Sequence, residues 1–346
     1  MGSVQTVPER VGRVPVMMDV ARAAGVSQKT VSRVINDAPH VRADVRERVL
    51  AAVRELGYRP NTAARALVTQ RTHVIGAIAV GTRYYGPATR LLSIEHAARA
   101  KGYSLAINST PDPWLDDVHG AVESLLQRGA EGVILEVPSV DVRLDTDLLR
   151  DVPVVSNVGP LPGIRHIALL GASQPLVGRL AARHLLDLGH TRLAHVAGPR
   201  RWDAAVARRE GWQAELRSAG VDAGPVLEGD WSPRSGYACG LELARSGATG
   251  VFVANDSMAM GVVRALVESG LRVPEDVSVV GVDDVPEAEF QVVPLTTVRL
   301  DQTVSTDRAL HDLVAMIEGA QHLDPVDAPP PLLIPRRSSG PPAARP

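Results

Sequence analysis

The chain has 346 residues, 45% of them hydrophobic and 22% charged, which is ordinary for globular domains and excludes a wholly disordered or fibrous protein. Its single cysteine, Cys239, cannot form an internal disulfide, which favours a reducing compartment. No segment reaches the roughly 18 uncharged apolar residues of a membrane span, and the N-terminus lacks the apolar stretch of a signal peptide. We therefore expect a cytoplasmic protein that has no contact with a membrane.

The net charge of −2 conceals an asymmetry along the chain. Residues 1–71 contain 12 Lys and Arg against 6 Asp and Glu, whereas the remaining residues contain 25 against 33. A small basic segment joined to a larger acidic one is typical of a module that meets nucleic acid, attached to one that does not. Chance clustering of surface arginines is the alternative interpretation.

Residues 16–56 predict three short helices, because apolar residues recur at helical spacing and two turns interrupt them. The first helix ends at Gly25, and Ser27 is a suitable N-cap for the second, which spans residues 28–36. The third runs from about residue 43 to 56. Two short helices joined by a tight turn are typical of a helix-turn-helix, whose second helix enters the major groove of DNA.

The outward face of the second predicted helix carries side chains suited to base edges. Lys29 and Arg33 can donate to guanine, and Gln28 can pair with adenine. The alternative is a three-helix bundle whose polar face meets only solvent. The predicted DNA contacts of this segment are Ser27, Gln28, Lys29, Thr30, Ser32, Arg33 and Asn36.

The segment MDVARAAGVSQKTVSRVINDAPHVRADVRERVLAAVRELGYRPNTAARAL resembles the DNA-binding headpiece of the LacI/GalR family over some fifty residues. The resemblance implies a hinge helix at residues 62–68 with Asn61 as its N-cap. Such a helix folds on DNA and inserts Leu67 into the minor groove, with Ala64 as a further contact. A rigid helix between domains is the alternative.

From residue 73 onward, short apolar strands alternate with amphipathic helices, which predicts an α/β fold with parallel sheets covered on both faces. Ligands of such sheets bind beyond the carboxyl ends of the strands. Polar side chains at these ends, together with a tryptophan that offers a ring face, suit a hydroxyl-rich ligand. The candidates are Asn157, Arg208, Trp231, Asn255 and Asp283. Helix capping is the alternative role for strand-end residues, above all for Asp256 and Asp284.

The runs AGPRRWDAAVARREGW, EGDWSPRSGY and FVANDSMAMGVVRALVESGLRVPEDVSVVGVDD resemble the effector-binding core of the same family. The resemblance implies that Arg208, Asn255 and Asp283 hydrogen-bond the effector and that Trp231 stacks on it. Asn157 occupies a position that usually holds aspartate, a departure that leaves the sugar open. The implied fold is that of periplasmic sugar-binding proteins, with two Rossmann-like subdomains and three crossovers.

The predicted division of the chain follows from these segments. It comprises a disordered arm (1–15), a helix-turn-helix domain (16–60), a hinge (61–71), a core (72–336) and a disordered tail (337–346). Within the core, subdomain 1 takes about residues 73–171 and 299–324, and subdomain 2 takes about 172–298 and 325–336. Because the tail lacks a leucine heptad, we expect a homodimer without a tetramerising helix.

These patterns predict a repressor that binds a palindromic double-stranded DNA operator and is released by a small sugar. A purine or a phosphorylated sugar as corepressor is the alternative within the family, although only Arg208 with Arg209 suggests a phosphate site. A solute-binding protein is a further alternative. The sequence contains no nucleophile elbow, phosphate-binding loop or dinucleotide fingerprint, so we expect no enzyme and no cofactor. His166, His190 and His195 are expected in local hydrogen bonds or at the surface and not at a metal.

Overall fold

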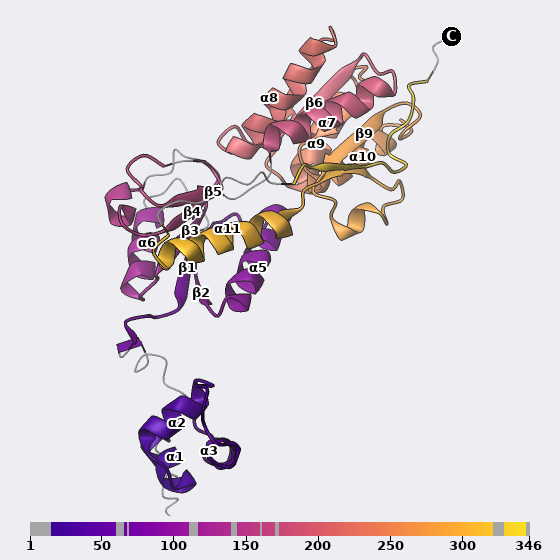
Figure 1. Cartoon of the computed structure of the whole chain (residues 1–346). Coiled ribbons are helices and arrows are strands. Elements are labelled where there is room, and N and C mark those ends of the chain that lie inside the picture. Colours follow the sequence, from indigo (N-terminus) through magenta and orange to yellow (C-terminus); the bar gives the residue numbers. More distant parts are fainter. Residues whose placement is uncertain are drawn as a thin grey trace, which may run out of the picture. The chain divides into compact units, whose positions relative to one another are not determined.

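The computed structural model describes residues 15–59, 66–67, 69–110, 117–139, 144–159, 161–169, 173–320 and 329–343. The chain divides into two compact units, residues 1–72 and residues 73–346 (Figure 1). We refer to them as the headpiece and the core. The disordered arm predicted at residues 1–15 lies outside the described residues except for its last position.

The headpiece contains helices α1 (Met17–Ala24), α2 (Gln28–Ile35) and α3 (Ala43–Leu56). Val20, Val31 and Val49, one from each helix, are fully buried against one another in its small core. Gly25 ends α1 in the left-handed conformation, with φ 65°, which glycine adopts without strain. The turn that follows brings α2 across α1, as the spacing of apolar residues predicts.

Subdomain 1 of the core is built on a five-stranded parallel sheet in the order β2-β1-β3-β4-β5. Its strands are β1 (Val74–Val80), β2 (Ser104–Thr110), β3 (Gly132–Glu136), β4 (Val154–Ser156) and β5 (Ile167–Leu169). Side chains alternate along β1, so that Ile75 packs beneath helices α5 (Tyr85–Ala100) and α11 (Gln302–Ile317), and Ile78 beneath α6 (Asp117–Gln127). Helices therefore cover both faces of the sheet.

Subdomain 2 is built on a six-stranded sheet in the order β11-β10-β9-β8-β6-β7. Its strands are β6 (Leu193–Ala197), β7 (Val226–Glu228), β8 (Gly250–Val253), β9 (Ser278–Val282), β10 (Thr296–Arg299) and β11 (Leu332–Ile334), the last antiparallel to β10. Helices α7 (Gln174–Asp187) and α8 (Asp203–Ser218) cover one face, and α9 (Pro233–Leu243) and α10 (Asp256–Glu268) cover the other. The predicted fold class is confirmed.

The chain passes between the two subdomains more than once. It leaves subdomain 1 after β5, returns after β10 to form α11, and reaches subdomain 2 again to form β11 (Figure 1). The strands of both sheets point their carboxyl ends at the space between the subdomains, since Asn157, Asn255 and Asp283 follow β4, β8 and β9 there. Residues distant in sequence therefore meet at one cleft.

The tail predicted to be disordered at residues 337–346 is instead packed on subdomain 2 over residues 337–343. Ser338 is fully buried, and its hydroxyl donates to the carbonyl of Val279 at 2.6 Å and accepts from the amide of Thr296 at 2.8 Å. The amide of Gly340 donates to the Ser278 hydroxyl at 3.0 Å. The prediction was wrong because these residues are held by hydrogen bonds to β9 and β10 and not by an apolar pattern.

Candidate functional site

The exposed face of α2 carries the polar side chains that the sequence predicts at DNA. Gln28, Lys29 and Arg33 are exposed, and none of their side chains has a hydrogen bond or ion pair to another described residue. Ser27 is the N-cap of α2, and its hydroxyl oxygen accepts from the Thr30 amide at 3.1 Å. The helix is thus anchored at its start, while its longest polar side chains are available to a partner.

The remaining polar residues of this face have partners within the helix. The hydroxyls of Ser27 and Thr30 lie 2.9 Å apart, and the Asn36 amide donates to the Ser32 hydroxyl at 3.4 Å. In the hinge, residues 66, 67 and 69 are helical, and the Leu67 side chain is 85% exposed. Asn61 and Ala64 lie outside the described residues.

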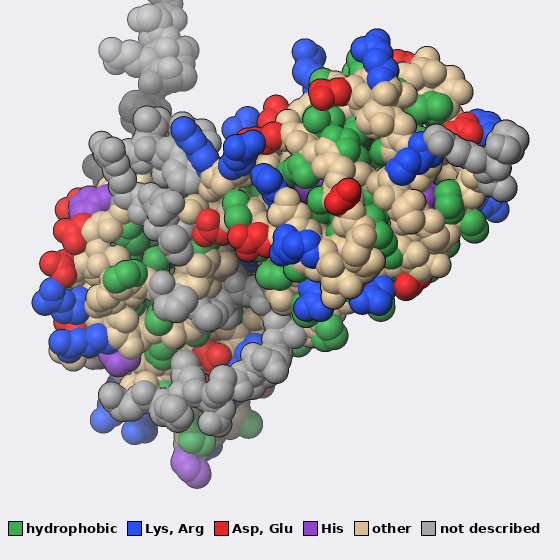
Figure 2. All heavy atoms as spheres, turned by 90° about the horizontal axis from the view of Figure 1, so that it is seen from above, with side chains coloured by type: hydrophobic (Ala, Val, Ile, Leu, Met, Phe, Trp, Pro, Cys, Tyr) green, Lys and Arg blue, Asp and Glu red, His purple; other side chains and the backbone are tan. Residues whose placement is uncertain are grey.

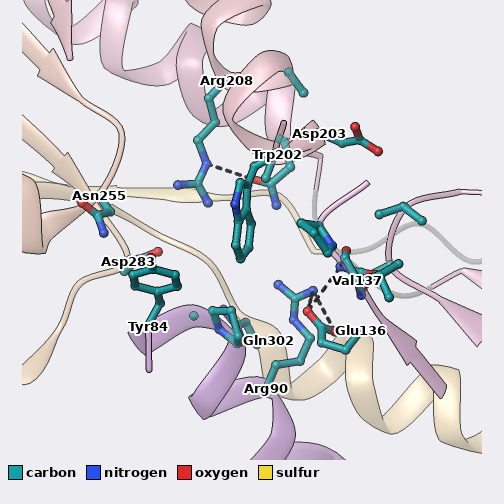
Figure 3. A pocket seen from close by; sticks show the side chains of 18 of the residues that line it. Tyr84, Arg90, Glu136, Val137, Trp202, Asp203, Arg208, Asn255, Asp283 and Gln302 are labelled. Carbon is teal, nitrogen blue, oxygen red and sulfur yellow. Dashed lines mark hydrogen bonds and ion pairs between the residues drawn. The ribbon is translucent and has the colours of Figure 1, made fainter. Parts of the chain in front are cut away.

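A cleft of about 380 Å³ lies between the two subdomains of the core, and its side chains are drawn in Figure 3. All five predicted effector contacts line it: Asn157, Arg208, Trp231, Asn255 and Asp283. Its wall also includes aromatic residues, polar residues and an ion pair, none of which the sequence predicts: Tyr84, Arg90, Glu136, Gln174, Trp202 and Gln302.

Arg208 enters the cleft from α8 with its side chain fixed at two points. Its Nε donates to Gln174 Oε1 at 2.9 Å and its Nη1 to the carbonyl oxygen of Ala254. The two helices that carry Arg208 and Gln174 approach closely at Gly178, where a Cβ would lie 1.9 Å from the Arg208 carbonyl oxygen. Glycine at that position therefore places the guanidinium at the cleft wall, with Nη2 unused by any described residue.

Asp283 lies on the same wall of the cleft as Arg208, at the end of β9 in subdomain 2 (Figure 3). Its φ of 110° is in the left-handed half of the map, which is strained for a residue other than glycine and is typical of functional positions. Burial raises the pKa of Asp283 to about 6, although the nearby Arg208 and Arg90 guanidinium groups oppose the shift. Its carboxylate has no hydrogen bond to a described side chain, so it can accept from a ligand hydroxyl.

Aromatic rings form the wall between the charged groups. The Trp202 ring lies edge-on to Trp231 at 5.8 Å and to Tyr84 at 5.9 Å between centroids. Trp231 is only 6% exposed, and its ring lies over Gly198, where a Cβ would approach within 2.2 Å. The guanidinium of Arg208 lies 5.9 Å from the Trp231 ring centre. The rings offer apolar faces to a ligand whose edges meet the polar groups.

The two predicted amide contacts line the cleft, but their amide groups are already engaged. Asn255 is the N-cap of α10, where its Oδ1 accepts from the Met258 amide at 2.9 Å and its Nδ2 donates to the Trp231 carbonyl at 3.1 Å. Asn157 exchanges hydrogen bonds of 2.9 Å with both backbone groups of Val137. These residues fix the cleft wall, and their capacity for a ligand is reduced.

Neither Asp256 nor Asp284 caps a helix, although the sequence offers that role as the alternative for both. Asp256 is fully buried and accepts from the Thr297 hydroxyl at 2.7 Å and from the Val285 amide at 3.0 Å. Asp284 accepts from Arg299 Nε and forms an ion pair with Arg336, each at 2.7 Å. Both carboxylates support the loop that carries Asp283 and lie outside the cleft lining.

Two of the three histidines considered as ligands lie in the core of subdomain 2. His195 is buried, its Nδ1 lies 3.0 Å from the Phe252 carbonyl, and burial lowers its pKa to about 4. His190 Nδ1 lies 3.0 Å from the Thr249 hydroxyl. Within the described ranges, no group of three or more potential ligands is placed to hold a metal ion, and no helix there is long and apolar enough to span a membrane.

Known proteins resemble the chain along most of its length. Residues 16–61 match bacterial regulatory proteins of the lacI family, and residues 182–339 match a periplasmic binding protein-like domain. The chain is 34% identical over 311 residues to the lactose operon repressor of Escherichia coli K12, covering 88% of this chain and 85% of the relative. It is 33% identical over 336 residues to the transcriptional repressor PurR of Haemophilus influenzae, covering 91% and 96%.

Solved structures agree with these matches. The lac repressor dimer bound to operator and the anti-inducer ONPF has a TM-score of 0.84 at 31% identity, covering 95% of this chain and all (100%) of that one. A complex of the transcriptional regulator CelR with cellobiose has a TM-score of 0.69 at 30% identity, covering 94% and 99%. The resemblance that the sequence predicts is confirmed. The chain belongs to the lacI family of bacterial regulatory proteins, which are DNA-binding regulators of transcription.

Proposed function

We propose that the chain is a homodimeric repressor that binds a palindromic operator and leaves it when a neutral sugar occupies the cleft. The observation that carries the proposal is the convergence of Arg208, Asp283 and the Trp231 ring on one cavity. A fixed donor, an unpaired acceptor and an apolar ring face suit the hydroxyls and ring carbons of a sugar.

The charges of the cleft favour a neutral ligand over a phosphorylated one. Two arginines and three acidic residues are found among the residues that line it. Arg209, considered with Arg208 as a phosphate site, lines a separate groove on subdomain 2. On the coloured part of the face in Figure 2, acidic side chains lie next to the basic ones. A purine is the second candidate, because the aromatic wall also suits a flat ring and PurR is a relative.

Release requires that the ligand bind the two arrangements of the core unequally. Hydrogen bonds between described residues join the subdomains beside the cleft: Tyr84 Oη donates to the Asp230 carbonyl at 3.2 Å, and the Asp203 amide donates to the Pro138 carbonyl at 2.8 Å. A ligand that contacts both walls changes the stability of these contacts. The resulting shift of subdomain 1, from which the chain leads to the hinge, weakens the DNA-bound dimer.

Dimeric binding is supported by the operator-bound dimer of the lac repressor among the structural relatives. One headpiece for each half-site requires two copies on a palindrome. We expect sedimentation of the DNA complex to show two chains per operator.

The test is a fluorescence-anisotropy titration of the full chain against DNA from beside its own gene and against scrambled DNA, at two salt concentrations. Lactose, D-galactose, cellobiose, D-ribose and hypoxanthine are then added to the preformed complex. Selective binding that a neutral sugar abolishes supports the proposal, whereas a complex that tightens with hypoxanthine supports the purine alternative. Equal, steeply salt-dependent binding to both DNAs contradicts sequence-specific repression by this operator.

A further inference from the structure

A second arginine enters the cleft from the wall opposite Arg208. Arg90 lies on α5 of subdomain 1, its side chain is 14% exposed, and Figure 3 shows its guanidinium pointing into the cavity. Its Nη1 donates to both carboxylate oxygens of Glu136, at 2.9 and 3.3 Å. A charged pair in this position is costly to bury, so a role in packing alone does not account for it.

The remaining donors of Arg90 are available to a ligand. Its Nε and Nη2 donate to no other described residue, and together they form the planar fork that matches two neighbouring oxygens. Arg90, Asp283 and Arg208 all line the same cleft, and the positive charge of Arg90 acts to lower the pKa values of the other two groups. A ligand held by Arg208 and Asp283 therefore lies within reach of the fork.

Glu136 is the dedicated counter-ion of Arg90. Its side chain is 5% exposed at the carboxyl end of β3, and Asn157 Nδ2 also donates to it at 3.3 Å. Burial raises the pKa of Glu136, and the charge and hydrogen bond of Arg90 oppose the shift. The positive charge of Arg90 is thus balanced before any ligand arrives, whereas its Nε and Nη2 have no partner among the described residues.

We propose that Arg90 binds two neighbouring hydroxyl oxygens of the ligand, and that Glu136, by balancing its charge, makes the cleft select neutral sugars over the corresponding sugar acids. The inference rests on the proposed function, since it assigns the ligand class of the same cleft. Arg90 and Glu136 are then specificity-determining residues of subdomain 1, opposite Arg208 and Asp283 of subdomain 2.

The experiment measures binding by calorimetry to the full chain for matched pairs: D-galactose and D-galacturonate, D-glucose and D-glucuronate, cellobiose and cellobiouronate. The wild-type chain should bind the neutral member of a pair more tightly. Arg90→Lys keeps the charge but loses the fork, so affinity for the neutral sugar should fall about 10-fold. Glu136→Gln leaves the arginine charge unbalanced, so the ratio of acid to neutral affinity should rise on the order of 10-fold.

Arg99→Lys and Glu95→Gln are the matched controls, because they change an exposed ion pair on the same helix α5. Both should leave all affinities unchanged. If Glu136→Gln does not fold, Arg90→Lys tests the fork alone.

The inference is overturned if the wild-type chain binds the acid more tightly than the neutral sugar, or if Arg90→Lys binds with wild-type affinities. In either case, sugar-induced release from operator DNA would still support the proposed function. The inference is also overturned if Glu136→Gln folds and its ratio of acid to neutral affinity equals that of the wild-type chain. Absence of binding by any neutral sugar overturns both.

Discussion

Asp256 makes the stability of the core depend on pH in a direction opposite to that of most paired carboxylates. It is fully buried beneath the loop that carries Asp283, and its pKa is raised to about 8, chiefly by burial and then by the charge of Asp283. The hydrogen bonds from Thr297 and Val285 oppose the shift. The folded chain therefore retains a proton that the unfolded chain, with an ordinary pKa of 3.8, releases.

Proton linkage gives the direction in which the free energy of unfolding changes with pH. Between pH 4 and pH 8 the native state binds more protons than the unfolded state, so the free energy of unfolding falls as pH rises. One pKa unit corresponds to about 1.4 kcal/mol, which makes the contribution of this residue on the order of 5 kcal/mol across that interval. Asp256→Asn cannot ionise and should remove this dependence, so the variant gains stability relative to wild type as pH increases.

The assay is urea unfolding followed by tryptophan fluorescence at pH 4.5, 6.5 and 8.5. All four tryptophans lie in the core, so the signal reports that unit alone. Asp276→Asn is the control, because Arg272 holds the pKa of this half-buried aspartate at about 2. Its removal should lower stability about equally at all three pH values. A constant difference between Asp256→Asn and wild type over this range would refute the reasoning.

Four further substitutions test the DNA-binding segment and the ligand cleft. Ser27→Ala removes the cap of α2 and should lower headpiece stability by about 1 kcal/mol, seen as faster amide exchange in that helix; unchanged exchange would contradict the capping role. Leu67→Ala should weaken operator binding more than nonspecific binding in an anisotropy titration, and equal losses on both DNAs argue against a minor-groove wedge. Asp283→Asn should retain operator binding but lose release by sugar, whereas a normal response would remove this residue from the effector site. Gly198→Ala places a Cβ within 2.2 Å of the Trp231 ring, so sugar affinity should fall at least 10-fold with a change in tryptophan emission; wild-type affinity would show that the ring position is unimportant.

Much of the fold could be predicted because local chemistry and tertiary structure agree. Gly25 and Ser27 end and start helices where the sequence indicates, and the strand-end position of Asp283 places it at the cleft. Arg90 and Glu136 could not be found in this way, since one lies inside a helix and the other closes an apolar strand. Only the packing of α5 against the sheet brings them together.

The packing of residues 337–343 could not be predicted for a related reason. Ser338 satisfies buried groups of β9 and β10 through its hydroxyl and backbone, and such hydrogen bonds have no periodic signature in a sequence. The same limit applies to Asn157 and Asn255. The sequence places both at strand ends, but whether an amide meets a ligand or the neighbouring backbone is decided by the local loop geometry.

The position of α11 and of residues 338–340 determines the order in which the protein can form during synthesis. The headpiece helices have all their buried partners within residues 17–58 and can pack as soon as that segment leaves the ribosome. One face of the sheet in subdomain 1 lacks the helix α11 until that segment has emerged. The inner strands of subdomain 2 lack their hydrogen bonds to Ser338 until later still. A nascent chain can therefore present a folded DNA-binding unit before its ligand-sensing core exists, so control by ligand begins only after residues 338–340 have been synthesised.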